Sequence, residues 1–183
     1  MYVKTDKNGD IVLLSIYVDD LIITGSADKL ITDIKMKLSQ EFEMKDLGEM
    51  HYCLGLEVWR NDGRTLITQS KYTNEVLKRF HINECKVVST PLEQNIKLKR
   101  DDGTKEVNRT MYRQLVGSLN YLTTTRPDID YVVSILSQFM AKPHESHWIA
   151  AKRVLRYLKG TINFGIEYTN TCNVELTGHS DSD

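Results

Sequence analysis

Cysteine and proline are both scarce in this chain of 183 residues, which contains three of each. The cysteines, Cys53, Cys85 and Cys172, lie far apart along the chain. An odd number at such spacing fits neither a disulfide framework nor the closely spaced cysteine pairs of a zinc site. The cysteine pattern therefore favours a reducing compartment, and we expect an intracellular, cytoplasmic protein.

The sequence also lacks long apolar runs, repeats and low-complexity stretches. The most apolar run, residues 11–23, contains Asp19 and Asp20, and a lipid bilayer does not tolerate such a pair. The N-terminus has no apolar core of a signal peptide. With 40% hydrophobic and 27% charged residues, the composition is that of an ordinary globular protein, and we expect no membrane partner.

The net charge of −1 conceals an uneven distribution along the chain. Residues 1–60 carry 7 lysines and arginines against 11 aspartates and glutamates, residues 61–165 carry 17 against 10, and residues 166–183 carry none against 4. A basic middle between acidic ends fits metal-binding carboxylates beside a phosphate-binding surface. Lysine-rich helical surfaces are common, however, and explain the same distribution equally well.

Turn and strand patterns dominate the first third of the chain. Asn8-Gly9 and Asn61-Asp62-Gly63 are hairpin signals, and the second lies inside a predicted hairpin over residues 52–68. An apolar stripe predicts a helix over residues 27–42, with Ser26 as its N-cap. A short helix follows Ser70, which we expect to cap it.

The remainder of the chain is predicted to be mainly helical. Residues 83–108 are polar and contain Pro91, which indicates a linker or long loop. Three apolar helical patterns follow between about 110 and 160, and Phe164, Ile166 and Tyr168 alternate as in a strand. We therefore predict an α+β fold, with an open-edged antiparallel sheet in residues 1–68, a helix packed on it, and a helical region after it.

The residues most informative about chemistry are Tyr17-Val18-Asp19-Asp20, between two β-rich runs. This position places two adjacent carboxylates at a hairpin tip, where they would repel each other without a cation. Hard oxygen ligands suit Mg²⁺, and nucleotidyl transfer uses two such ions about 3.5–4 Å apart. The alternative is an ordinary turn, in which aspartate is common because it tolerates turn dihedrals.

These four residues and their flanks closely resemble the polymerase active-site box of copia-type LTR retrotransposon reverse transcriptases. Further segments resemble that family in the same order along nearly the whole chain: residues 42–48 (FEMKDLG), 52–57 (YCLGLE), 69–72 (QSKY), 89–92 (STPL), 112–122 (YRQLVGSLNYL), 125–129 (TRPDI) and 152–161 (KRVLRYLKGT).

The resemblance implies roles for particular residues. Asp19 and Asp20 would be two of the three metal-binding carboxylates of an RNA-directed DNA polymerase, with Mg²⁺ as the cofactor. Tyr17 and Val18 would lie near the primer terminus. Asp181 would be the first metal carboxylate of a ribonuclease H domain.

The resemblance also implies a domain organisation. Residues 1–68 would form part of the palm, including a primer-grip-like hairpin, and residues 69–109 a thumb-like helix and linker. Residues 110–163 would form the helical thumb and connection, and residues 164–183 the start of a truncated ribonuclease H domain.

Two parts of the family pattern are missing from this sequence. The third polymerase carboxylate and the fingers lie upstream of residue 1, and the remaining ribonuclease H ligands lie beyond Asp183. We therefore expect a template–primer duplex and the N-terminal fingers and palm of the same polyprotein as partners, and no activity of the chain alone. A catalytically inactive remnant that at most binds nucleic acid is the main alternative, because Met1 directly precedes the acidic hairpin. A phosphate-handling α/β protein with a parallel sheet is a third.

Two further groups of residues have both a functional and an ordinary interpretation. Lys152, Arg153, Arg156 and Lys159 lie at one end of the last helix, where they would meet duplex phosphates or simply form a solvated face. His144 and His147 have the spacing of metal ligands on a helix, but we favour a solvated helix start.

Overall fold

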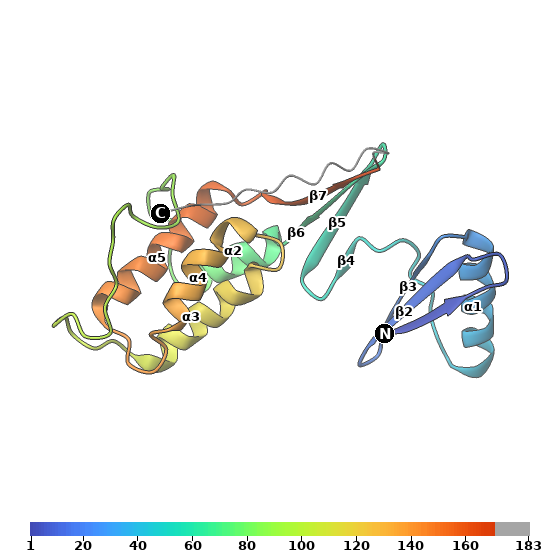
Figure 1. Cartoon of the computed structure of the whole chain (residues 1–183), viewed down its shortest axis with the longest axis horizontal. Helices are drawn as coiled ribbons and strands as arrows, with labels where there is room; N and C mark the ends of the chain where they lie inside the picture. Colours follow the sequence, from blue (N-terminus) through green and yellow to red (C-terminus); the bar gives the residue numbers. More distant parts are fainter. Residues whose placement is uncertain (171–183) are drawn as a thin grey trace. The chain divides into compact units, whose positions relative to one another are not determined.

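The structure, a computed structural model, describes residues 1–170 and divides the chain into two compact units, residues 1–49 and residues from 50 onward (Figure 1). The first unit is a three-stranded antiparallel sheet in the order β1 (Tyr2–Thr5), β2 (Ile11–Tyr17), β3 (Asp20–Gly25), followed by helix α1 (Asp28–Glu41). Only Val12 is buried in this unit, and no residue of α1 is. The first unit therefore has almost no buried core of its own.

The start of α1 differs from the prediction. Ala27, not Ser26, is the N-cap residue, and no side chain caps the helix. The Ser26 hydroxyl instead accepts a hydrogen bond from the Ile11 amide at 3.0 Å and donates one to Asp10 at 2.9 Å. Ser26 therefore does not cap α1, because its hydroxyl bonds the start of β2 through the Ile11 amide and the Asp10 carboxylate.

The second unit begins with a four-stranded antiparallel sheet. Its order is β4 (Tyr52–Cys53), β5 (Leu56–Asn61), β6 (Arg64–Thr68) and β7 (Gly165–Thr169), so a strand distant in sequence completes the sheet. Gly165 allows this pairing, because a Cβ atom there would clash with the Ile67 carbonyl oxygen. The absence of a side chain at position 165 therefore lets β7 approach β6 at normal strand spacing.

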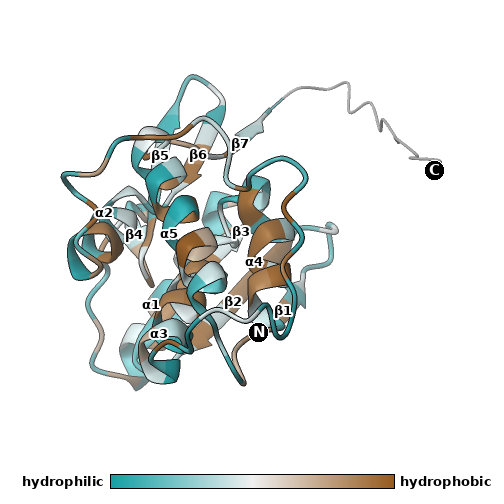
Figure 2. Ribbon diagram, turned by 90° about the vertical axis from the view of Figure 1, so that its left-hand side faces the viewer, coloured by the Kyte–Doolittle hydropathy of each residue, from teal (hydrophilic) through white to brown (hydrophobic). Residues whose placement is uncertain are grey.

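A helical layer accounts for the core of the second unit. It consists of α2 (Ser70–Arg79), α3 (Arg109–Leu122), the short 3₁₀ helix η1 (Pro127–Ile129), α4 (Asp130–Ser137) and α5 (Glu145–Gly160). Their apolar stripes, visible as brown bands in Figure 2, form one cluster with fully buried side chains from α3, α4 and α5. Ser70 starts α2 without capping it, because its hydroxyl donates to the Ile162 carbonyl at 3.0 Å.

The α+β class with antiparallel strands is confirmed, as are the predicted helices and the loop at 83–108. The prediction of one sheet within residues 1–68 is wrong. The strands form two sheets, because the irregular segment 42–51 separates β3 from β4 and because β7 pairs with the second group. All strand pairs among residues 1–170 are antiparallel, which contradicts the α/β alternative. The domain boundaries at 68, 109 and 163 remain predictions.

Candidate active-site hairpin and its surroundings

The acidic pair lies at the tip of the β2–β3 hairpin, as predicted. Tyr17 pairs with Asp20, which leaves Val18 and Asp19 as a two-residue turn. Val18 has a φ of 53°, a conformation that β-branched residues rarely adopt. All four residues are exposed, Val18 at 84% and Tyr17 at 58%. The hairpin thus presents two carboxylates to solvent from a strained turn.

The oxygen donors at this tip suit a magnesium ion. Mg²⁺ usually takes one or two protein carboxylates and completes its octahedral shell with waters and substrate phosphates. Two adjacent exposed aspartates on a short turn match that requirement in donor type and accessibility. Among residues 1–170, no group of three or more His, Cys, Asp or Glu side chains is placed to hold a metal ion.

The second predicted hairpin, over residues 52–68, forms β4, β5 and β6, and a two-residue turn joins its first two strands. Cys53 pairs with Leu56, so Leu54 and Gly55 form a two-residue turn with φ of 49° and 79°. Positive φ at both positions is the signature of a type I′ turn. The Tyr121 hydroxyl of α3 donates a hydrogen bond to the Leu54 carbonyl. A helix of the core therefore holds the turn from outside the sheet.

Strand β5 is also tied to α2. The buried Glu57 carboxylate accepts a hydrogen bond from the Lys71 amide at 2.6 Å and so satisfies an amide in the first turn of α2, which has no side-chain cap of its own. The Lys71 ammonium lies 5.0 Å from the centre of the Tyr52 ring on β4. Together these contacts connect β4 and β5 to the helical layer.

The predicted phosphate-binding residues of α5 contact their own chain. Lys159 donates to the carbonyls of Asn83 and Cys85, at 2.5 and 2.8 Å, Arg156 donates to the Lys86 carbonyl at 2.7 Å, and Arg153 donates to the Thr90 hydroxyl at 3.1 Å. The Lys152 ammonium lies 5.2 Å from the centre of the Trp148 ring. All four side chains are half-buried. Arg153, Arg156 and Lys159 bind the segment 83–90 to the helix, whereas Lys152 contacts a residue of α5 itself. Any nucleic-acid role rests on the part of each cation that stays accessible.

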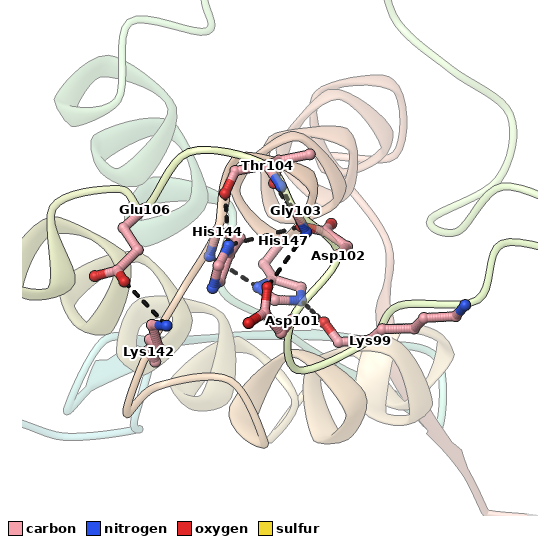
Figure 3. A network of polar contacts seen from close by, with 9 residues as sticks. All are labelled: Lys99, Asp101, Asp102, Gly103, Thr104, Glu106, Lys142, His144 and His147. Carbon is pink, nitrogen blue, oxygen red and sulfur yellow. Dashed lines mark hydrogen bonds and ion pairs between the residues drawn. The ribbon is translucent and has the colours of Figure 1, made fainter.

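His144 and His147 form a buried polar network with the loop at 99–106 (Figure 3). They are 3% and 0% exposed, so the predicted solvated helix start is wrong. His147 accepts the His144 amide on Nδ1 at 2.9 Å and donates from Nε2 to the Lys99 carbonyl at 2.8 Å. This bonding fixes the neutral form, and burial lowers the pKa of His147.

Asp102 completes this network on the loop side. Its carboxylate accepts hydrogen bonds from the Thr104 amide at 3.0 Å and hydroxyl at 2.7 Å and lies 3.6 Å from Nδ1 of His144. The pKa of Asp102 is held well below its usual range, first by the nearby Ser146 hydroxyl and then by the Thr104 hydroxyl and amide. The network therefore connects the loop to the first turn of α5.

Arg126 and Asp128 form a second buried network. Arg126, 2% exposed, makes two hydrogen bonds to Asp128, at 2.9 and 2.7 Å, and two to Thr161, at 2.9 and 2.6 Å. Tyr157 donates to Asp128 at 2.8 Å. Burial alone would raise the pKa of Asp128, but the Arg126 and Tyr157 hydrogen bonds outweigh it and lower that pKa. Arg126 thus connects η1 to Thr161 at the end of α5.

Sequence reasoning placed the acidic hairpin but missed the residues that hold the second hairpin and the helical layer together. Tyr121 and Glu57 lie in predicted elements, but their partners are 67 and 14 residues away. Arg126 lies between two predicted helices, and Thr161, one of its partners, is 35 residues away. The available signal was that all three residues lie in segments that resemble the family, at 52–57, 112–122 and 125–129. Asp181, the predicted ribonuclease H ligand, lies outside the described residues.

Comparison with known proteins identifies the class of this chain. Residues 1–94 match the family model of reverse transcriptase (RNA-dependent DNA polymerase). The chain is 44% identical over 177 residues, 97% of its length, to the retrovirus-related Pol polyprotein from transposon RE1 of Arabidopsis thaliana, of which it covers 12%. It is 35% identical over its whole length to the Pol polyprotein from transposon TNT 1-94 of Nicotiana tabacum, of which it covers 14%.

A shorter relative matches over most of both chains. The chain is 39% identical over 171 residues to an uncharacterized mitochondrial protein of Arabidopsis thaliana and covers 70% of it. The chain therefore belongs to the reverse transcriptase family, among the copia-type retrotransposon Pol polyproteins. It spans about an eighth of the length of the first Pol polyproteins it matches.

No solved structure matches the chain. Within the described part of the chain, every helix is too short or too polar to cross a lipid bilayer.

Proposed function

We propose that this chain supplies part of the catalytic centre of an RNA-directed DNA polymerase from a retrotransposon. One observation carries the proposal: the Asp19–Asp20 pair occupies the tip of a tight, exposed hairpin in a chain of the reverse transcriptase family. The reaction is template-directed nucleotidyl transfer to a primer 3′ end.

Asp19 and Asp20 would hold Mg²⁺ with one or more oxygens each, and the rest of the shell would come from waters, nucleotide phosphates and a carboxylate outside this chain. In this class of reaction the metal supplies stabilisation of the negative charge that develops on the attacking and leaving oxygens. Tyr17 and Val18, beside the pair, would contact the primer terminus. The short turn fixes the backbone at Asp19 and Asp20, which limits where the two carboxylates can lie.

The second unit would hold the template–primer duplex. The β4–β6 hairpin is proposed as a primer grip, because its turn is fixed by Tyr121 and its strands by α2. The helices α2 to α5 would act as thumb and connection, and the α5 cations Lys152, Arg153, Arg156 and Lys159 would add phosphate contacts from their accessible parts. Asp181 is proposed as the first ligand of a ribonuclease H site.

Metal binding by the acidic hairpin tests the proposal without requiring activity. Mn²⁺ is added to the whole chain, and its broadening of amide NMR signals is compared with that in the Asp19→Asn/Asp20→Asn variant. Broadening centred on residues 17–20, reduced at least tenfold in the variant, supports the proposal. The control is Glu41→Gln/Glu43→Gln, which removes two exposed carboxylates from the same unit. Equal loss in both variants means non-specific attraction and contradicts the site.

A second candidate is a catalytically inactive retroelement remnant that binds nucleic acid at most. The observation that favours it is the absence, within residues 1–170, of a third side chain placed with Asp19 and Asp20 to hold a metal. This candidate predicts duplex binding that weakens with salt but does not depend on Mg²⁺. Mg²⁺-dependent binding that the Asp19→Asn/Asp20→Asn change abolishes argues against it.

A further inference from the structure

The Leu54–Gly55 turn is held by a tyrosine from another element. Tyr121 lies on α3, 67 residues away in sequence, and its hydroxyl donates to the Leu54 carbonyl. A type I′ turn at the end of a two-residue strand has few strand hydrogen bonds to hold it. The tyrosine supplies a hydrogen bond at the outermost point, where the ladder supplies none.

Gly55 is suited to this contact in two ways. Its φ of 79° favours glycine, and a Cβ atom at this position would lie 2.8 Å from the Tyr121 hydroxyl oxygen. The backbone of the turn therefore approaches Tyr121 more closely than a residue with a side chain would allow. Glycine at position 55 therefore allows both the turn conformation and the contact with the Tyr121 hydroxyl.

Tyr121 itself is held in place. The ring of Tyr72 on α2 meets it edge to face, with centroids 4.9 Å apart, and both helices belong to the core of this unit. Leu54 is 41% exposed and Tyr121 37%, so the turn is open to solvent on its outer side. The hydroxyl thus joins a rigid helical layer to a turn that stays accessible to a ligand.

We propose that Tyr121 is a positioning residue that sets the Leu54–Gly55 turn at the place where it meets a primer strand. This inference rests on the proposed function of the hairpin as a primer grip. It assigns the tyrosine no contact with substrate: the residue acts through the backbone of the turn, and its hydroxyl is the group that matters.

The test replaces only that hydroxyl. Tyr121→Phe keeps the ring and its contact with Tyr72, and Tyr131→Phe, at a residue 74% exposed on α4, is the matched control. Two quantities are measured on the whole chain. One is the hydrogen exchange rate of the turn amides. The other is the affinity for an RNA/DNA duplex with a recessed primer 3′ end and for a blunt duplex with the same number of phosphates.

The expected result is turn exchange about fivefold faster in Tyr121→Phe, the factor that corresponds to one lost hydrogen bond of ordinary strength. Affinity for the recessed duplex falls by a similar factor, affinity for the blunt duplex stays unchanged, and Tyr131→Phe changes neither. Gly55→Ala, which pushes against the same hydroxyl, gives the same pattern.

Three results would overturn the proposal or its premise, and they are distinguishable. Unchanged turn exchange in Tyr121→Phe means the tyrosine does not hold the turn. Equal loss of affinity for both duplexes means that its role is structural only. A wild-type chain that binds both duplexes equally contradicts the primer-grip function, while turn exchange still decides whether Tyr121 fixes the turn.

Discussion

Val18 is the residue at which local backbone preference and observed conformation conflict most. It is β-branched and sits at a φ of 53° in the turn that carries Asp19. Such a conformation costs free energy, and strained residues concentrate at functional sites. The turn therefore keeps a valine where glycine would be more stable.

Replacing Val18 with glycine is expected to stabilise the β2–β3 hairpin by about 1 kcal/mol, because glycine adopts positive φ freely. Hydrogen exchange of the β2 and β3 amides measures the change. Val3→Gly, the same chemical change at a strand residue that is 59% exposed, is expected to destabilise by roughly the same amount. Destabilisation by both substitutions would show that Val18 is not strained.

His147 predicts how the stability of the second unit depends on pH. Burial, which outweighs the hydrogen bond to the Lys99 carbonyl and the charge of Asp102, lowers the folded-state pKa below the ordinary 6.5. The unfolded chain therefore takes up a proton that the folded chain excludes. The contribution of His147 to stability is complete above pH 6.5 and is lost as the pH falls below it.

Urea unfolding at pH 7.5 and pH 5.5 tests this dependence. The wild-type free energy of unfolding is expected to fall toward pH 5.5, and His147→Gln, which keeps one acceptor and one donor, is expected to reduce the fall. His51→Gln, at an exposed histidine, is the control and should leave the pH dependence unchanged. The same fall in the His147→Gln variant as in the wild type would assign it to another group.

At the scale of elements, Arg126 connects η1 to the end of α5 through four hydrogen bonds. Lysine keeps the charge but cannot reproduce the planar, two-point contact with Asp128. Arg126→Lys is therefore expected to lower the free energy of unfolding by about 2 kcal/mol. Arg64→Lys, in an exposed ion pair with Glu167, is expected to change it by less than about 0.5 kcal/mol. Similar small effects in both variants would refute the role given to Arg126.

The elements that the sequence predicted well are those with local signals. Asn8-Gly9 and Asn61-Asp62-Gly63 favour the backbone dihedrals of tight turns. The apolar stripes of α3 and α5 indicate their buried faces. Each of these patterns can be recognised within a short stretch of sequence. The pairing of β7 with β6 and the contact of Tyr121 with Leu54 join residues far apart in sequence. No local pattern encodes such partners, which is why the sheet was predicted as one and the turn contact was missed.

At the scale of the whole molecule, the two units bury very different amounts of apolar surface. The first has one buried residue, Val12, whereas the second has a continuous core cluster across its helices. Because burial of apolar surface is the dominant stabilising contribution, the units should differ in local stability. Hydrogen exchange on the whole chain is expected to show the slowest amides in α3 and α5 and faster exchange throughout β1, β2 and β3. Uniform protection would contradict this division.

Primer extension tests the central claim most directly. The whole chain is supplied with an RNA template, a DNA primer, deoxynucleotides and Mg²⁺, alone and together with a separately produced fingers and upstream palm segment of a copia-type Pol polyprotein. The account predicts no extension by the chain alone and Mg²⁺-dependent extension with the added segment. Asp19→Asn/Asp20→Asn should abolish that extension, and Glu41→Gln/Glu43→Gln should preserve it. Extension that survives the loss of both aspartates would contradict the assignment of the β2–β3 hairpin as the catalytic centre.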